Sequence, residues 1–217
     1  MYAVTKPPTD ERILMAAASI IDRHGEAGVR INDICKSLKI TAPSVYHFFG
    51  DREGLIEATQ SYRYARGQDE FIQWFADGVY GCSNSSEFVR HIHAAIHLLL
   101  SPSRREFRRA RADVLGSAQY RPSLATKVSE AQNKSNLRQV ETLRYARAKG
   151  WIKDDFDLEA FSAWTSGLSV GKRLVELTGS STDIKQWDDI TTRAICLVLG
   201  VPEPKAAPRK RRRNPTK

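Results

Sequence analysis

The side chains best suited to chemistry gather in the segment TAPSVYHFF, residues 41–49. Thr41 is a favourable helix N-cap, and Pro43 suits a first helical turn, where its missing N–H costs nothing. At about 100° per residue, we expect Val45, Phe48 and Phe49 to share one side and to pack on the preceding helices. The opposite side then presents hydroxyl, phenol and imidazole groups beside small residues.

That exposed side has the chemistry of a nucleic-acid contact. Tyr46, His47 and Thr41 offer hydrogen-bond donors to phosphate oxygens, and a helix N-terminus adds its own N–H groups. Small side chains let a helix approach base edges in a major groove, where an apolar one can touch a thymine methyl. The small members of the set are Ala42, Pro43 and Ser44. The alternative is a small three-helix core with a tyrosine that happens to be exposed.

Two earlier segments would position this helix. Apolar residues recur at helical spacing over residues 10–24, and again at i, i+3, i+4 and i+7 over residues 31–38. Short helices over 31–38 and 42–49, joined by a three-residue turn, make a helix-turn-helix, whose second helix enters the DNA major groove. Arg52, at the start of the next helix, would clamp a phosphate.

The rest of the chain also has helical spacing, without a clean alternation of period two, so we expect an all-α protein. Pro and Gly residues separate the later segments. Further helices are expected at about 52–77, 85–100, 103–118, 121–149, 157–178 and 183–199. Three parts follow from this pattern: short helices in residues 1–51, a larger helical part in 52–202 and a basic tail in 203–217.

Charge and composition narrow the function classes. The 217-residue chain has a formal net charge of +9, and seven of its basic residues follow Pro204 without an acid, which leaves +2 for the rest. A polycationic tail is too polar to fold and binds any nucleic acid without reading its sequence.

The longest apolar run, AAIHLLL, is too short to span a membrane, and the start lacks a signal peptide. The three scattered cysteines lack metal-binding spacing. We expect a cytoplasmic protein with no membrane partner, no metal and no cofactor.

Residues 10–58 resemble the DNA-binding domain of the TetR family of bacterial transcriptional regulators. The most specific stretch, TAPSVYHFFGDREGL, fits the family pattern Thr/Ser-x-x-x-hydrophobic-Tyr-x-aromatic-Phe-x-x-Lys/Arg-Glu-x-Leu. The resemblance implies recognition by residues 41–47 and DNA-backbone contacts from Tyr46 and Arg52. Two residues depart from the family. Lys39 stands where the family usually has Gly, and Arg30 stands where it favours Thr or Ser, although Arg30 can reach a phosphate.

The resemblance also implies that residues 52–202 form a domain that binds a small-molecule effector and dimerises through its last two helices. The expected dimer-interface residues are Phe161, Trp164, Leu168, Gly171, Ile190, Ala194 and Leu197. The expected effector-binding residues are Phe71, Trp74, His93, His97, Arg104 and Arg108. The alternative for both sets is that they belong to the hydrophobic core, which would show the same sequence pattern.

Two features leave alternatives open. His93 and His97 lie one helical turn apart, a spacing that can share a metal, but no matching carboxylate accompanies them, so a pocket or core role is favoured. The segment RREFRRAR, residues 104–111, carries five arginines. It could bind an anionic ligand, contact DNA near the domain junction, or form a solvated helix face.

Together these patterns predict a ligand-responsive DNA-binding transcriptional regulator associated with the nucleoid. We expect a repressor that binds a palindromic operator in double-stranded DNA as a homodimer. No nucleophile–base pair, paired-carboxylate helix or Gly-rich phosphate loop is found, so no catalytic residue is predicted. One alternative is a helical ligand-binding protein or enzyme with a vestigial helix-turn-helix. The other is a non-specific nucleic-acid binder that acts through its tail.

Overall fold

The computed structural model describes residues 7–204, and within them the protein is built from helices alone. This confirms the all-α prediction. The first three α-helices are α1 (Thr9–His24), α2 (Ile31–Leu38) and α3 (Ala42–Phe49). The larger part holds α4 (Arg52–Tyr80), α5 (Ser85–Leu100), α6 (Arg105–Ala118), α7 (Pro122–Ala148), α8 (Leu158–Thr178) and α9 (Ser181–Leu199). Most of the basic tail lies outside the described residues.

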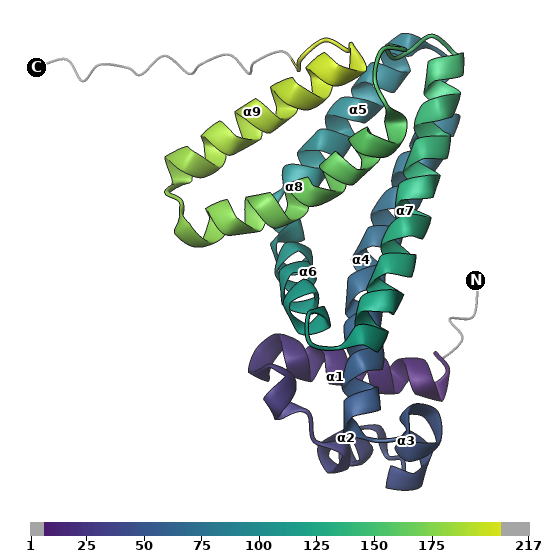
Figure 1. Cartoon of the computed structure of the whole chain (residues 1–217), viewed down its shortest axis with the longest axis vertical. Coiled ribbons are helices and arrows are strands. Elements are labelled where there is room, and N and C mark those ends of the chain that lie inside the picture. Colours follow the sequence, from purple (N-terminus) through teal and green to yellow (C-terminus); the bar gives the residue numbers. More distant parts are fainter. Residues whose placement is uncertain (1–6, 205–217) are drawn as a thin grey trace, which may run out of the picture.

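The helices form a small unit and a larger one that share the long helix α4 (Figure 1). Helices α1 to α3 make the lower end, and α4 rises from them beside α7. Helix α6 lies next to both, while α8 and α9 cross the upper end with α5. Short 3-10 helices, η1 (Glu26–Gly28) and η2 (Pro102–Arg104), stand before α2 and α6.

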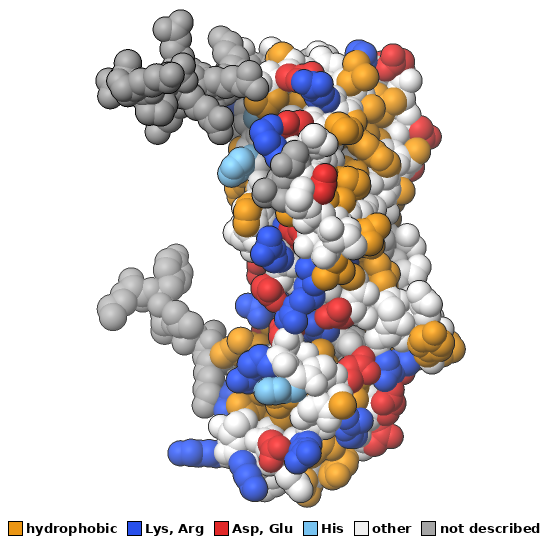
Figure 2. Space-filling view, turned by 90° about the vertical axis from the view of Figure 1, so that its left-hand side faces the viewer, with side chains coloured by type: hydrophobic (Ala, Val, Ile, Leu, Met, Phe, Trp, Pro, Cys, Tyr) orange, Lys and Arg blue, Asp and Glu red, His pale blue; other side chains and the backbone are white. Residues whose placement is uncertain are grey.

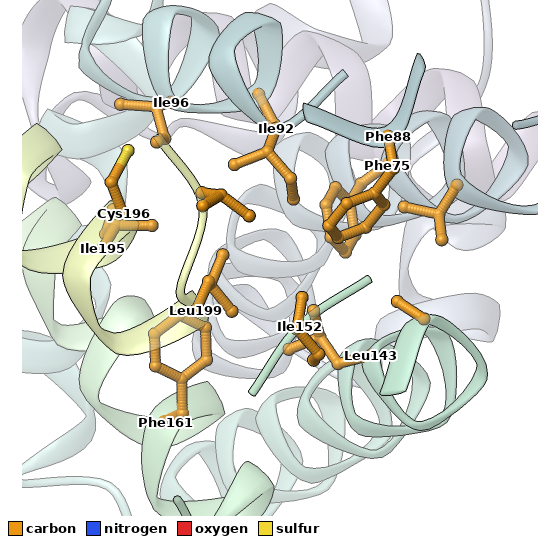
Figure 3. Packing of buried hydrophobic residues seen from close by; sticks show 14 of the residues in the cluster. Phe75, Phe88, Ile92, Ile96, Leu143, Ile152, Phe161, Ile195, Cys196 and Leu199 are labelled. Carbon is orange, nitrogen blue, oxygen red and sulfur yellow. The ribbon is translucent and has the colours of Figure 1, made fainter. Parts of the chain in front are cut away.

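Each unit has a hydrophobic core of its own. In the small unit the fully buried Ile13, Ile34, Val45 and Leu55 bring together α1, α2, α3 and the start of α4. Residues from α4, α5, α7, α8 and α9 converge in the larger core (Figure 3). Helices as short as α2 and α3 are unstable alone, so this packing holds the recognition segment in place.

Two local features of the helix-turn-helix bear on the expectations from the sequence, namely the backbone at Lys39 and the packed side of α3. Lys39 adopts the left-handed conformation, with φ 55° and ψ 49°, at the position where glycine would be unstrained. Phe48 was expected on the packed side of α3, but this expectation is wrong, because its side chain is 46% exposed. Within α3 the packed side is formed by the buried Val45 with the partly buried Ala42 and Phe49.

None of the helices within residues 7–204 is long and apolar enough to cross a membrane.

Candidate nucleic-acid interface

Helix α3 presents a surface of aromatic and polar side chains. Tyr46 is 49% exposed, and His47 and Phe48 beside it are exposed as well. Val45, on the opposite side, is completely buried among residues of α1, α2 and α4. The phenol and imidazole groups are therefore fixed in direction by a packed helix and remain open to a ligand.

The start of α3 is compact and polar. Thr41 occupies the N-cap position with extended backbone, although its side chain accepts no capping hydrogen bond. Its hydroxyl instead lies 3.2 Å from that of Ser44. Pro43 is exposed and Ala42 is partly buried, so the N-terminal turn carries little bulk. Such a turn suits a close approach to phosphates and base edges.

Basic residues surround this surface. Arg30 and Lys39 are exposed at the two ends of α2, and Arg30 makes no capping hydrogen bond with its side chain, as expected. Lys and Arg side chains project from the lower end of the molecule, where α2 and α3 lie (Figure 2). Exposed lysine and arginine side chains attract the phosphate backbone of DNA.

Arg52 has a structural role that the sequence did not indicate. Its Nε donates to the carbonyl of Val29 at 2.8 Å, and its Nη2 donates to that of Glu26 at 2.7 Å. Arg52 was expected to bind a phosphate, but two of its three guanidinium nitrogens hold η1 against the start of α4. Any contact with a phosphate would come from the same anchored guanidinium.

The junction between the two units is a polar network that sequence reasoning missed. Arg121, just before α7, donates to Glu26 Oε2 at 2.8 Å and also bonds to Glu53. Ser117 on α6 donates to Glu26 Oε1 at 2.8 Å, and Gln60 on α4 donates to the same oxygen. Burial raises the pKa of Glu26, but the hydrogen bonds from Gln60, Ser117 and Arg121 outweigh it and hold that pKa below its usual value.

A second cluster joins α1 to α4 and α6. The nearly buried Arg63 bonds to Asp22 at 2.6 Å, and Arg109 donates to the Asp22 carbonyl at 2.8 Å. These pairs join residues 41 and 87 positions apart, so no local sequence signal could have paired them.

The arginine-rich segment is largely an interior face. Arg108 is 1% exposed and forms an ion pair with Glu176, whose side chain is 2% exposed. Arg111 is buried over the ring of Tyr64, with 4.5 Å between guanidinium carbon and ring centroid. Arg104 packs against α4, and Arg109 reaches α1. Of the alternatives left open for this segment, a solvated helix face is therefore wrong for most of its arginines.

A pocket lies inside the larger unit, between α4, α5, α6, α7, α8 and α9. Of the six predicted effector-binding residues it includes Phe71 and Arg104. Trp74 is 39% exposed, His97 is exposed, and His93 bonds to the Pro202 carbonyl at 2.8 Å. Arg108 is held by its ion pair with Glu176. Within residues 7–204 no cluster of three or more His, Cys, Asp or Glu side chains is arranged to hold a metal.

The predicted dimer-interface residues divide between surface and core. Ile190 and Leu197 on α9 are 67% and 72% exposed, Trp164 is 40% exposed, and Ala194 is partly exposed. Phe161 and Leu168 instead belong to the core of the chain itself. Gly171 lies against Trp187 of α9, where an added Cβ would come within 2.8 Å of the indole ring.

Comparison with known proteins agrees with this geometry. Residues 13–59, which span α1 to the start of α4, match the family described as bacterial regulatory proteins, tetR family. The chain is 26% identical over 182 residues to the HTH-type transcriptional regulator UidR of Escherichia coli K12, covering 83% of this chain and 84% of that protein.

Two solved structures share the fold. Salmonella enterica GusR has a TM-score of 0.63 at 20% identity, and the match covers 91% of this chain and 98% of that one. A transcriptional regulator from Saccharomonospora viridis, solved in complex with choline, has a TM-score of 0.62 at 18% identity, with 86% and 94% coverage.

Proposed function

We propose that this chain is a DNA-binding transcriptional regulator of the tetR family, and that it is a repressor released from a palindromic operator by a small-molecule effector. The observation that carries this proposal is the exposed side of α3, with Tyr46 49% exposed while Val45 behind it is fully buried. Regulators of this family bind DNA, usually as dimers, and are generally not enzymes.

The proposed DNA contacts divide into two groups. Tyr46, Thr41 and His47 would hold phosphates, together with Arg30 and the anchored Arg52. Ala42, Pro43 and Ser44 would meet base edges, since their small side chains stand at the leading turn of α3. The boundaries of the DNA-binding part, residues 1–51, and of the effector and dimerisation part, residues 52–202, belong to the same proposal.

We propose that two chains associate through α8 and α9. Leu174, Leu177, Ile190 and Leu197 are 63% to 72% exposed, which is unusual for leucine and isoleucine on one pair of neighbouring helices. Hydrophobic side chains gather on the upper half of the molecule in the view along this side (Figure 2). In such a dimer the two copies of α3 would meet half-sites about 34–36 Å apart, one turn of DNA.

A small molecule would bind in the pocket of the larger unit, in the cytoplasm where the protein meets the bacterial nucleoid. A relative of the same fold was solved with choline, so the fold accommodates small ligands. The effector would shift the dimer toward a spacing that no longer fits the operator, to an extent limited by its differential affinity for the two states.

Selection from a random duplex DNA library with the full-length protein tests the proposal. Recovery of one inverted repeat, with a mass of two chains in light scattering, is the expected result. A parallel selection with a chain ending at Glu203 separates operator recognition from the basic tail. Binding that requires residues 204–217, enriches no motif and declines steeply with salt would overturn the proposal.

A further inference from the structure

The pocket in the larger unit is mainly apolar. Its walls include Phe75 and Leu143 with the isoleucines of α5 and α9, and several of these side chains face one another in Figure 3. The cavity volume is about 70 Å³, so a ligand larger than a few water molecules must displace side chains to enter. The apolar part of a ligand would make contacts with the lining that replace those the side chains now make with one another, at little cost in free energy.

One cation interrupts this apolar lining. The Arg104 guanidinium carbon lies 4.8 Å from the ring centroid of Phe71 and 4.3 Å from that of Phe107. Its Nη2 donates to the Gly67 carbonyl at 3.0 Å. Gly67 makes this close approach of α4 and α6 possible, because a Cβ there would lie 2.4 Å from the Phe107 ring. Arg104 is thus fixed in place by two rings and a carbonyl.

Its neighbours show what Arg104 lacks. Arg108, one turn later on α6, is neutralised by Glu176. Within residues 7–204 Arg104 makes no ion pair with a carboxylate. Its buried Nε has no hydrogen-bond partner, a feature that it shares with Arg108 and Arg111, so the missing carboxylate is what sets it apart from Arg108. The nearest acidic influence comes from Glu70, an exposed residue that lies 3.9 Å from Arg66. Burial and the nearby arginines lower the pKa of Arg104 to about 10, which still leaves it charged at neutral pH.

A second arginine, Arg111, lies outside the pocket lining but close enough to Arg104 to add to the positive charge there. Arg111 is buried and bonds to the side-chain oxygens of Gln68 and Gln132, which are neutral. The polar groups on the opposite wall are already paired with one another. Gln139 donates to Thr165 at 3.1 Å, and Ser169 donates to the Ser166 carbonyl at 3.0 Å. The positive charge of Arg104 therefore has no negative partner in the pocket, and a single ligand anion beside it would balance that charge.

We infer that the effector is a small carboxylate with an apolar body, whose carboxylate pairs with Arg104 while the body fills the pocket. This inference rests on the proposed function only in taking the pocket as the effector site. A carboxylate matches the planar guanidinium and brings the single negative charge that one unpaired arginine balances. A cationic ligand would meet Arg104 in the pocket wall and is disfavoured.

Calorimetric titration of the full-length protein in the absence of DNA tests the inference. The probes are octanoate against octanamide and 3-phenylpropionate against 3-phenylpropionamide, since each pair differs in charge and hardly in size. We expect the carboxylate of at least one pair to bind about tenfold more tightly than its amide. Arg104→Gln should reduce this ratio to about one. Arg105→Gln, which removes an exposed arginine from the adjacent position, should leave it unchanged.

Equal affinity for carboxylate and amide in both pairs, or no binding of any probe, would overturn the inference. A carboxylate preference that survives in Arg104→Gln would overturn the assignment to Arg104. Should that variant fail to fold, the wild-type comparison still decides, because it needs no substitution. These titrations contain no DNA, so their failure is distinguishable from a failure of operator recognition in the library selection.

Discussion

The Arg121 guanidinium lies 2.8 Å from the Glu26 carboxylate and bonds at the same time to Glu53. Arg121, just before α7, thereby connects η1 to α4. At this point ion pairs hold the larger unit against the small, DNA-binding unit. The pair is partly buried, with Arg121 and Glu26 side chains 21% and 27% exposed. Any movement of α6 or α7 that an effector causes would change the contacts of Glu26 at this junction.

We expect Arg121→Gln and Glu26→Gln each to lower stability, and the double variant to lose less than the sum. The coupling energy should be about 1 kcal/mol, since the pair is partly shielded from solvent. Urea unfolding of the four proteins at one protein concentration gives this value. Full additivity of the two single effects would show that the pair contributes nothing.

The same carboxylate predicts a pH dependence. The pKa of Glu26 in the folded protein lies below its ordinary value of 4.5, because the hydrogen bonds outweigh the effect of burial. A lowered pKa contributes stability that is complete above the ordinary value and is lost as the pH falls through the folded one. The difference in Tm between wild type and Glu26→Gln should therefore shrink from pH 6 to pH 4. A constant difference over this range would contradict the role of the ionised carboxylate.

The buried pair of Arg108 and Glu176 makes a different prediction. Arg108→Met alone should destabilise by about 3–5 kcal/mol, because it leaves the buried Glu176 carboxylate with only the half-exposed Arg105, 3.9 Å away. The double variant Arg108→Met, Glu176→Leu should recover most of that loss, since it removes both charges. Urea unfolding midpoints at one protein concentration provide the comparison. A double variant no more stable than Arg108→Met would show that lost packing, not the unpaired charge, is responsible.

Lys39 offers a test of backbone strain. Its left-handed conformation, φ 55°, costs an L-residue about 1 kcal/mol, which glycine avoids. We expect Lys39→Gly to raise Tm modestly. The matched variant Lys36→Gly, in the last turn of α2, should lower it, because glycine is about 1 kcal/mol less favourable than alanine within a helix. Loss of stability in Lys39→Gly would mean that its side chain contributes more than the strain costs.

The proposed division of DNA contacts can be checked by substitution in α3. Tyr46→Phe should weaken binding to every DNA sequence by a similar factor, because a phosphate contact carries no base information. Ser44→Ala should instead change the preference among operator variants. Affinities measured at several salt concentrations distinguish the two. Unchanged affinity of Tyr46→Phe at every salt concentration would remove Tyr46 from the phosphate contacts.

Much of the fold was predictable because its causes are local. Apolar spacing and helix-ending residues located α2, α3 and α5 at their observed bounds, and α4 to within a few residues. The exposed sides of Tyr46 and His47 followed from helical geometry once Val45 was assigned to the core. Phe48 was misplaced because the part of α3 that its neighbours cover is not a local property of the sequence, and the structure leaves this side chain 46% exposed.

By itself the sequence determined an all-helical regulator with a helix-turn-helix, since helical period and a short motif are properties of neighbouring residues. Only the tertiary structure decided what each arginine of the 104–111 segment does. Arg108 meets Glu176, 68 positions away, while Arg104 reaches the pocket without an acidic partner within residues 7–204. Identical side chains acquire different roles there because the role of a charge depends on its partner and on its distance from water, and both depend on how distant helices pack.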